Sequence, residues 1–495
     1  YVEGNATVEL EDEGEFNVTG SRYGVFAECD IEQGEKPLVT VTSATGIGRY
    51  GVAAQGTKVT VHRYVISYGS DFEDEWAGVL AHNGGEVIIG GSITAEGSAN
   101  TGVYACDGGC VTVKGDVSVS DGEDDDGTGI YLDCSADEDE SVVIIDGIIE
   151  ADKYIVFYVF DGSVEETIEF DFQQGCFDPD VSKDYRYYTA DDESFVYVAM
   201  FDGGSGTEED PFLVGDGTHL FNVREYLSDG KYFRQTAGID LNRHFGEDKG
   251  GWDPIGHIEL PFIGFYDGGN HTISNLYIYN SYFHNGDYTG LFAYIGENSE
   301  IRSVGLTNAY VVGEKNTGAL AGGSAGTVIN SYATGTVSVE TFGVGGLIGS
   351  NEGIISNCYF EGEVDGGSGT GGLVGYNETG ADVTGCHAVA TVTSKGEYGA
   401  GGLVGNNYGS VTGSYAICNV RGDNGVGGLV GASLGSIHGS YAIGVVRGHD
   451  LVGGLVGANG DLIDECFANV TVTGTGETEF DFYIFGGLVG RNGGE

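Results

Sequence analysis

The phrase GGLVG at residues 371–375 returns at residues 401–405, 427–431, 453–457 and 486–490, and it decides the fold. Related phrases precede it, namely GLF at 290–292, GALAG at 318–322 and GGLIG at 345–349. The leucines of the series stand at 291, 320, 347, 373, 403, 429, 455 and 488, so the shortest spacing, 26 residues (347 to 373), recurs with insertions. A repeat of this length predicts a solenoid whose coils stack on one another.

A second repeat fills the first part of the chain. Its phrases are YGVFAE (23–28), YGVAAQ (50–55), AGVLAH (77–82), TGVYAC (101–106) and TGIYLD (128–133). Each phrase is followed by a second alternating stretch, such as VTVHRYVIS (59–67) or EVIIGGSIT (86–94). Two or three short strands per coil, with glycine or acidic corners, are typical of a parallel β-helix.

These patterns divide the chain into four parts. We expect an N-terminal parallel β-helix over residues 1–160, an acidic connector over 161–202, a helix-containing entry module over 203–289 and a solenoid over 290–495. In the entry module, the stretch 218–230 predicts one helix, with Thr218 as N-cap and Gly230 as its end. Such a helix would shield the first coil from strand addition. The expected fold is all-β, a right-handed parallel β-helix in two tandem segments.

Charge limits the partners of this chain. The 76 acidic residues outnumber the 20 basic ones, which gives a net charge of −56. Nucleic acid and anionic membranes are therefore excluded as partners, and cations are the natural ones. No apolar run reaches 18 residues, so we expect no membrane insertion. Because Tyr1 opens directly into acidic sequence, we expect a processed, soluble chain or an excerpt of one.

Alternation predicts which side chains face inward. In CYFEGEV (358–364), the residues that share the parity of Cys358 are apolar or glycine, whereas Glu361 and Glu363 share the other parity. Burying unpaired carboxylates in every coil is prohibitive, so the cysteine parity faces the interior. The same rule applies to SYAICNVR (414–421) and CFANVTV (466–472).

The outward parity brings aromatic residues to one position in six successive coils. We expect them to form a ladder on the outer face: Tyr332, Tyr359, His387, Tyr415, Tyr441 and Phe467. Two interpretations remain open. The stacked rings stiffen the solenoid without a partner, or they form a stripe that binds glycans or a neighbouring subunit.

Nine cysteines are present, and none forms a C-x-x-C pair. Cys358 and Cys386 occupy the same inward position in adjacent coils, about 4.7–4.9 Å apart, a spacing that a disulfide tolerates. They are either a disulfide or buried free thiols. Cys106 and Cys110 in CDGGC form the closest couple. Five asparagines lie two residues before a threonine and are glycosylation candidates: Asn5, Asn17, Asn270, Asn377 and Asn469.

Two acidic groups precede coil glycines by the same few residues, which places them on one corner of the N-terminal helix. They comprise Asp71, Glu73 and Asp74 in one coil and Asp121, Asp124, Asp125 and Asp126 in another. Calcium could bridge these corners, and it is the one cofactor we consider. Solvated acidic loops are the other interpretation.

Residues 203–495 resemble the GLUG-motif proteins. The resemblance rests on the GGLVG phrases and on upstream segments such as GWDPIG (251–256) and FIGFYDGGNHTISNL (262–276). It implies an extracellular β-solenoid of the secreted or surface-displayed kind. GLUG repeats also accompany immunoglobulin A proteases and haemagglutinin-like adhesins, yet the H-E-x-x-H zinc motif of such a protease is absent from this sequence. The N-terminal segment resembles adhesin and pectate-lyase β-helices in architecture only.

These observations favour a structural function outside the cell. We expect no enzyme, but a rigid subunit of a filament, sheath or surface layer that self-associates into a homopolymer or lattice. The alternatives are an adhesin that binds glycans or host proteins, and a polysaccharide-active β-helix enzyme. Lysine and arginine are scarce, and we find no repeated cleft of paired carboxylates, so the enzyme is disfavoured.

Overall fold

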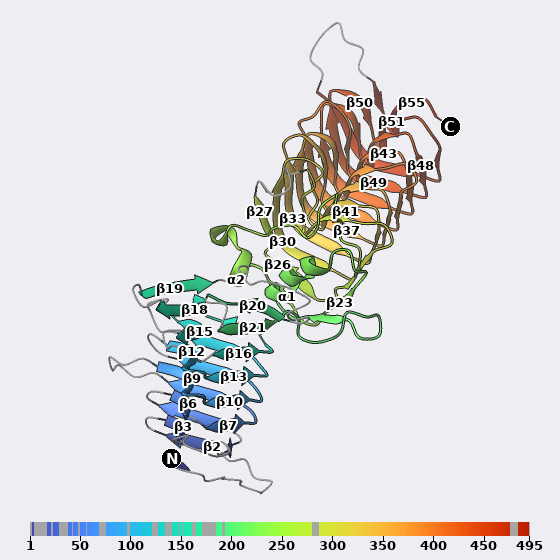
Figure 1. The fold of residues 1–495 in the computed structure, drawn as a ribbon. Coiled ribbons are helices and arrows are strands. Elements are labelled where there is room, and N and C mark those ends of the chain that lie inside the picture. Colours follow the sequence, from blue (N-terminus) through green and yellow to red (C-terminus); the bar gives the residue numbers. More distant parts are fainter. Residues whose placement is uncertain are drawn as a thin grey trace. The chain divides into compact units, whose positions relative to one another are not determined.

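The computed structural model forms two compact units, Tyr1–Asp202 and Gly203–Glu495, each described by itself. Every structural statement below concerns the described residues, which are 2–3, 17–20, 23–28, 38–41, 43–47, 50–55, 57–68, 76–96, 100–120, 127–133, 141–147, 149–151, 153–160, 165–170, 185–190, 194–279, 287–475 and 484–494. Stacked parallel strands build both units (Figure 1).

The first unit is a parallel β-helix with three sheets, as its repeat predicts. The glycine phrases stack in register, so that Val52 pairs with Val79 and Val79 with Val103, and all three are fully buried. Alternation arises because successive strand residues point to opposite faces, which leaves one face for the core.

Sheet A contains β1 (Val2–Glu3), β3 (Tyr23–Glu28), β6 (Tyr50–Gln55), β9 (Trp76–His82), β12 (Asn100–Cys106), β15 (Thr128–Asp133), β18 (Lys153–Phe160) and β19 (Glu165–Phe170). Sheet B contains β4 (Leu38–Val41), β7 (Lys58–Val61), β10 (Glu86–Ile89), β13 (Cys110–Val113), β16 (Val142–Ile145), β21 (Phe195–Ala199) and β20 (Tyr185–Tyr188). Sheet C contains β2 (Asn17–Gly20), β5 (Ser43–Ile47), β8 (Val65–Tyr68), β11 (Ile93–Glu96), β14 (Val117–Ser120) and β17 (Ile149–Glu150).

The segment 161–202 contributes strands to this unit. β21 extends sheet B in parallel on β16, and β20 then pairs with β21 in antiparallel orientation. In sheet A, β19 pairs antiparallel with β18. The change from parallel to antiparallel pairing marks the place where the described part of the helix stops adding coils.

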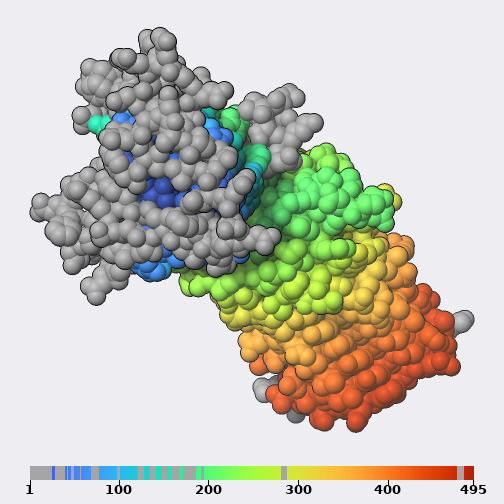
Figure 2. All heavy atoms as spheres, turned by 90° about the horizontal axis from the view of Figure 1, so that it is seen from below, coloured from blue at the N-terminus to red at the C-terminus, as the bar shows by residue number. Residues whose placement is uncertain are grey.

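The second unit is a solenoid with four sheets. A typical coil runs from sheet E to sheets G, F and D and back to E, and successive coils appear as stacked bands of colour in Figure 2. Sheet D contains β22 (Phe212–Val214), β23 (Tyr232–Gln235), β25 (Phe265–Asp267), β29 (Glu300–Arg302), β32 (Thr327–Ile329), β36 (Ile354–Ser356), β40 (Asp382–Thr384), β44 (Ser410–Thr412), β48 (Ser436–His438) and β52 (Ile463–Asp464).

Sheet E contains β24 (Ile239–Asp240), β26 (Thr272–Ser274), β27 (Tyr277–Tyr279), β30 (Gly305–Gly313), β33 (Tyr332–Val339), β37 (Tyr359–Gly366), β41 (His387–Ser394), β45 (Tyr415–Arg421), β49 (Tyr441–Gly448) and β53 (Phe467–Gly474). Sheet F contains β28 (Phe292–Ile295), β31 (Ala321–Ser324), β35 (Ile348–Asn351), β39 (Val374–Asn377), β43 (Val404–Asn407), β47 (Val430–Ser433), β51 (Val456–Asn459) and β55 (Val489–Asn492). Sheet G contains β34 (Phe342–Gly345), β38 (Ser368–Gly371), β42 (Ala400–Gly401), β46 (Asn424–Gly427), β50 (Asp450–Gly453) and β54 (Phe485–Gly486).

The predicted helix is present but shorter, and its cap differs. Helix α1 spans Gly217–Asn222 and continues as the 3₁₀ turn η1 (Val223–Tyr226). The prediction of Thr218 as N-cap is wrong, because the extended residue Asp216 accepts the His219 amide at 2.8 Å and Thr218 lies inside the first turn. A second short helix, α2 (Asn242–Phe245), precedes η2 (Glu247–Lys249). Among the described helices, none has the length and apolar character needed to cross a bilayer.

The motif leucines form one buried column at the corner between sheets G and F. The amide of Leu347 donates to the carbonyl of Leu373 at 3.0 Å, and the amide of Leu373 donates to that of Leu403 at 2.9 Å. All leucines of the series are fully buried except Leu488 in the last coil, which is 41% exposed. The stacking that the spacing predicts is therefore confirmed.

Contact between coils explains the glycines beside each leucine. A Cβ atom on Gly402 would lie 2.1 Å from the carbonyl oxygen of Gly428, and one on Gly428 would lie 2.2 Å from that of Gly454. Real Cβ atoms do not approach backbone oxygens so closely. The second glycine of GGLVG is thus required because the next coil passes directly against it.

Three cysteines and three serines form an inner ladder. Its members occupy the same position in six coils: Ser331, Cys358, Cys386, Ser414, Ser440 and Cys466. Each side chain donates to the carbonyl two residues earlier and accepts the amide of its counterpart in the preceding coil, for example Ser414 Oγ from Cys386 N at 3.0 Å and Cys386 Sγ from Cys358 N at 3.4 Å. Each sulfur therefore takes the place of a serine hydroxyl.

Of the two interpretations of Cys358 and Cys386, the structure has the buried free thiols. Both are free thiols, because each sulfur is engaged with the backbone of its own and the preceding coil. Cys106 and Cys110 are not joined to each other by a disulfide. They lie at the end of β12 in sheet A and the start of β13 in sheet B, on opposite sides of a turn.

A buried amide ladder is a feature that the sequence analysis missed. The side chain of Asn351 donates to Asn377 Oδ1 at 2.8 Å, Asn377 donates to Asn407 Oδ1 at 2.8 Å, and Asn407 donates to Ser433 Oγ at 3.0 Å. Asn377 is fully buried, so its prediction as a glycosylation site is wrong for the folded chain. A glycan on Nδ2 would remove these hydrogen bonds and would not fit the interior.

Replacement of a motif glycine tests the stacking. Gly402→Ala is expected to lower the free energy of unfolding of the second unit by about 1–3 kcal/mol or more, because its methyl group overlaps Gly428. Gly487→Ala is the matched control, since it occupies the same motif position and would meet no described atom within 4 Å. Urea denaturation measures both. Equal losses of stability in the two variants would contradict the account.

Thiol labelling tests the inner ladder. In the native protein, the buried Cys358 and Cys418 are expected to resist alkylation at pH 8, whereas the half-buried Cys110 reacts. Burial raises the pKa of Cys358 and raises that of Cys418 to about 12, so little thiolate is present at this pH. Peptide mapping by mass spectrometry provides the readout. A Cys358–Cys386 disulfide in non-reduced peptides would overturn this assignment.

Candidate functional site

The outer face of sheet E is the candidate interaction surface. It is built by the outward residues of β33, β37, β41, β45, β49 and β53, and the burial of these strands alternates as the parity rule predicts. Cys358 and Phe360 face the core, whereas Glu361 and Glu363 are exposed. Because the strands pair in strict register, outward residues at equal positions form straight columns.

One of these columns is the aromatic ladder. Its ring centroids are separated by 4.8 Å (Tyr332–Tyr359), 4.9 Å (Tyr359–His387), 4.7 Å (His387–Tyr415), 5.0 Å (Tyr415–Tyr441) and 4.8 Å (Tyr441–Phe467). The planes of neighbouring rings differ by at most 12°. The six rings that the spacing aligns therefore stack in one continuous column.

Stacking limits which parts of the aromatic rings a partner could contact. Each inner ring has neighbours against both faces, so mainly ring edges and hydroxyl groups remain at the surface. Gly305 lies against the other side of Tyr332, since a Cβ atom there would be 2.6 Å from the tyrosine Cζ. Phe467 is the most open ring, with 54% exposure. A sugar that binds by lying flat on an aromatic face finds few free faces along this column.

The composition of the face beside the ladder is unlike that of the whole chain. Over β41, β45, β49 and β53 the outward residues include no aspartate or glutamate. Val389 and Ile417 are 38% and 42% exposed, and Ile443 continues their column. Arg421 and Arg447 stand paired at the far end of β45 and β49. In a chain of net charge −56, this carboxylate-free area is a distinct surface.

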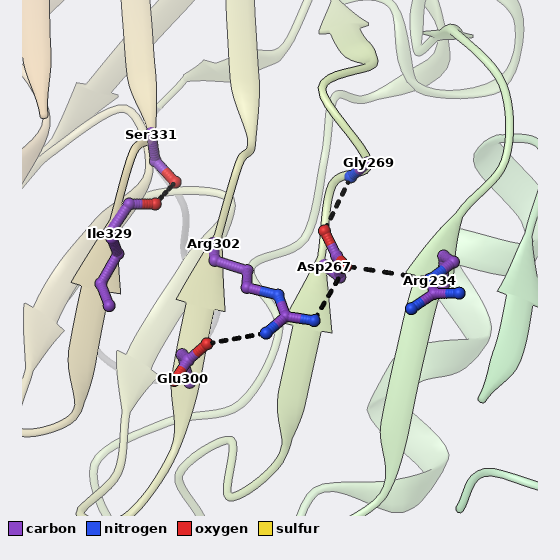
Figure 3. A network of polar contacts seen from close by, with 7 residues as sticks. All are labelled: Arg234, Asp267, Gly269, Glu300, Arg302, Ile329 and Ser331. Carbon is purple, nitrogen blue, oxygen red and sulfur yellow. Dashed lines mark hydrogen bonds and ion pairs between the residues drawn. The ribbon is translucent and has the colours of Figure 1, made fainter. Parts of the chain in front are cut away.

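A charged network marks the outer face of sheet D near the start of the second unit (Figure 3). Asp267 on β25 accepts hydrogen bonds from Arg302 Nη2 at 3.0 Å and from the Gly269 amide at 3.0 Å, and Arg234 Nε lies 3.8 Å away. Arg302 also donates to Glu300 at 3.4 Å. Hydrogen bonding to Asp267 raises the pKa of Arg302.

The network lines a cavity of about 170 Å³ beside the stacked rings of Tyr232 and Phe265, whose centroids are 4.3 Å apart. Since carboxylates already pair with both arginines, the network links the rungs β23, β25 and β29 rather than offering a free charge. Such exposed pairs contribute at most about 1 kcal/mol each.

The acidic residues predicted to bind calcium all lie outside the described residues: Asp71, Glu73, Asp74, Asp121, Asp124, Asp125 and Asp126. Within the described ranges, no group of three or more potential metal-ligating side chains occurs. Among the glycosylation candidates, Asn270 and Asn469 are exposed, Asn17 begins β2, and Asn5 lies outside the described residues. Modification at Asn270, Asn469 and Asn17 stays a prediction.

The histidine in the ladder makes its stability depend on pH. Burial lowers the pKa of His387, and Glu361 opposes this shift only in part. Because the native state holds the proton less tightly than the unfolded chain, the contribution of His387 is present above about pH 6.5 and is lost as the pH falls below it. We expect His387→Tyr to raise the melting temperature, relative to wild type, more at pH 5 than at pH 8. An equal difference at both pH values would contradict this prediction.

Comparison with known proteins identifies the repeat. The GLUG motif family matches residues 340–365 and 366–393. A candidate Gly-rich membrane protein of Evansella cellulosilytica is 37% identical over 145 residues, which cover 29% of this chain and 16% of that protein. Halomucin of Haloquadratum walsbyi is 32% identical over 170 residues, which cover 34% of this chain and 2% of that protein. The match thus covers only a small part of each relative.

One solved structure is also similar. It is the crystal structure of a candidate immunoglobulin A1 protease from Bacteroides ovatus, with 22% identity and a TM-score of 0.40 over 60% of this chain and 87% of that one. The family match covers residues 340–393. These residues include Leu347 and Leu373, whose backbones are hydrogen-bonded to each other in neighbouring coils. The chain carries GLUG-motif repeats, and they fold as coils of a parallel β-solenoid.

Proposed function

We propose that this chain is a structural component of a cell-surface assembly outside the cell, in which copies associate side by side through the outer face of sheet E. The observation that carries the proposal is the carboxylate-free area over β41, β45, β49 and β53. An exposed area with stacked aromatics and the half-exposed aliphatic residues Val389 and Ile417 is typical of an interface.

A second copy of this chain fits that area electrostatically. Arg421 and Arg447 add positive charge at one side of an otherwise neutral face. The rest of the chain is strongly acidic, with a net charge of −56, so another copy supplies the opposite charge. The sheet is regular, and its backbone groups are paired within the solenoid, so contact through side chains does not require strand exchange.

The interior supports a rigid role. The serine–cysteine ladder and the asparagine ladder connect each coil to the next by hydrogen bonds, and the leucine column fills the corner between sheets G and F. Fully satisfied buried networks of this kind make a structure stiff and specific. We therefore expect the solenoid over residues 305–475 to be stiff along its axis.

Net charge sets the condition for association. Two copies repel each other at low ionic strength, because each carries −56. The Debye length falls from about 10 Å at 0.1 M salt to about 3 Å at 1 M. We therefore expect side-by-side association at high salt or with divalent cations. The names of the relatives, which include a Gly-rich membrane protein, support a location at the cell surface.

An adhesin that binds glycans along the ladder is the weaker candidate, because neighbouring rings cover the aromatic faces that a sugar would use. The proposal assigns no catalytic step to the chain. This part rests on the scarcity of basic residues, and an activity screen on polysaccharides is its direct test.

Sedimentation of the purified full chain in rising salt tests the proposal. Wild type is expected to form larger species in molar salt, and Ile417→Glu is expected to remain monomeric because it places a carboxylate in the contact face. Thr384→Glu is the matched control, since it adds the same charge on the exposed face of sheet D. Both positions are outward, so neither substitution should unfold the chain.

Two outcomes would sink the proposal. One is a wild-type chain that stays monomeric in molar salt and with calcium at the highest soluble concentration. The other is an Ile417→Glu variant that assembles as well as wild type. Loss of assembly in both glutamate variants would also count against a role specific to sheet E.

A further inference from the structure

A groove on the outer face of sheet F interrupts the repeat. It encloses about 330 Å³ over β43, β47, β51 and β55. Ala432 and Ala458 form its floor, Tyr398, Tyr408 and Leu434 form its walls, and Arg491 closes one end. Tyr398 and Tyr408 are each 39% exposed, and Leu434 is 66% exposed. These side chains belong neither to the core nor to the face of sheet E.

The groove arises where a column of glutamates ends. The residue after each member of the asparagine ladder points to solvent, and in successive coils this residue is Glu352, Glu378, Tyr408, Leu434 and Gly460. In the neighbouring column, the large Tyr376 gives way to Asn406, Ala432 and Ala458. In the first column the acidic residues are thus replaced by the apolar walls of the groove. In the second column the bulky residue is replaced by the small residues of its floor.

Tyr398 reaches the groove from an insertion. The interval between the motif leucines 373 and 403 is four residues longer than the interval between 403 and 429. The extra residues lie in the turn before β42, and they place the ring of Tyr398 against the next coil. Gly425, with φ +65°, makes room for it, since a Cβ atom there would be 3.3 Å from the tyrosine ring.

Arg491 is the one charged residue that lines the groove. No ion pair of Arg491 occurs within the described parts of the chain. Burial raises the pKa of Tyr398 and Arg491 opposes this shift, which places the guanidinium near the phenol. An unpaired arginine beside two tyrosines, without a carboxylate in the lining, is unusual in a chain with 76 acidic residues. The N–H groups of its guanidinium are therefore available to donate hydrogen bonds to an anion.

We propose that this groove binds an acidic saccharide, with the sugar rings lying against Tyr398 and Tyr408 and a sugar carboxylate paired with Arg491. Tyrosine side chains that are exposed on one side provide the aromatic surface that the sheet E ladder lacks. The bidentate fit of guanidinium to carboxylate favours a uronic acid over a neutral sugar. The net negative charge of the chain is screened beyond about 8 Å at physiological salt, so the local arginine dominates.

A peptide fits the groove less well. Extended peptides bind mainly by adding a strand at a sheet edge, where backbone groups are free. Here β43, β47, β51 and β55 already pair with one another, and the groove lies on their face. The proposal does not depend on side-by-side association, because the groove is on sheet F and the contact face is on sheet E.

Calorimetry with the full chain at about 0.15 M salt, where its net charge is screened beyond about 8 Å, tests the proposal. The probes are tetragalacturonate and its fully methyl-esterified form, in which a neutral methyl ester replaces each carboxylate. Tetragalacturonate is expected to bind at millimolar concentration or tighter, and Arg491→Gln is expected to weaken it about tenfold. The ester is expected to bind more weakly and to be insensitive to Arg491→Gln. Tyr408→Ala should weaken both probes, and Ala458→Trp should abolish binding by filling the floor.

Arg243→Gln is the matched control, because it removes an exposed arginine of helix α2 that belongs neither to the groove nor to the contact face, and it should leave binding unchanged. Absence of tetragalacturonate binding at millimolar concentration would overturn the proposal, as would binding that survives Ala458→Trp. Equal or tighter binding of tetraglutamate, with the same dependence on Arg491, would show that any short polyanion suffices and would overturn the saccharide assignment. Circular dichroism of each variant ensures that a loss of binding reflects the groove.

Discussion

The rest of the second unit depends on the close passage of one coil over the glycines of the next. At Gly402 and Gly428 a carbonyl oxygen occupies the space in which any other residue would carry its Cβ atom. This contact fixes the height and the rotation of each coil relative to its neighbour. The same contact recurs at Gly372 and Gly454, and over these coils the columns of leucine, asparagine, serine or cysteine, and aromatic residues follow the same axis.

Much of this arrangement could be predicted from residues alone. The interval between motif leucines and the separation of carboxylates from apolar residues in CYFEGEV were sufficient to place Tyr359 and Tyr415 outside and Cys358 inside. Both signals are local, since alternation within a strand and equal spacing between strands need no knowledge of the turns. The ladder geometry follows from them directly.

The errors have a common physical origin in contacts that cross coils. Cys386 looks like a disulfide partner when only the spacing is considered, but the amide of Cys358 is already directed at its sulfur. Asn377 looks like a sequon, yet its amide group belongs to a buried ladder that links three coils. Asp216 replaces Thr218 as the helix cap because backbone conformation, which spacing does not reveal, selects it. The groove beside Tyr398 depends on an insertion whose direction could not be read from the sequence.

The surfaces of the second unit differ in chemistry although the coils are alike. Sheet E presents a carboxylate-free, partly apolar face over β41, β45, β49 and β53, sheet D carries paired charges, and sheet F changes from glutamates to a groove with a single arginine. Such differences on a constant scaffold indicate where a repeat protein meets its partners. The most direct test of the central claim is native-state hydrogen exchange of the peptides that contain Leu373, Leu403 and Leu429. Their motif amides are expected to exchange only through unfolding of the whole unit, because each donates to the leucine carbonyl of the next coil. Exchange as fast as that of exposed turns would contradict the stacked solenoid.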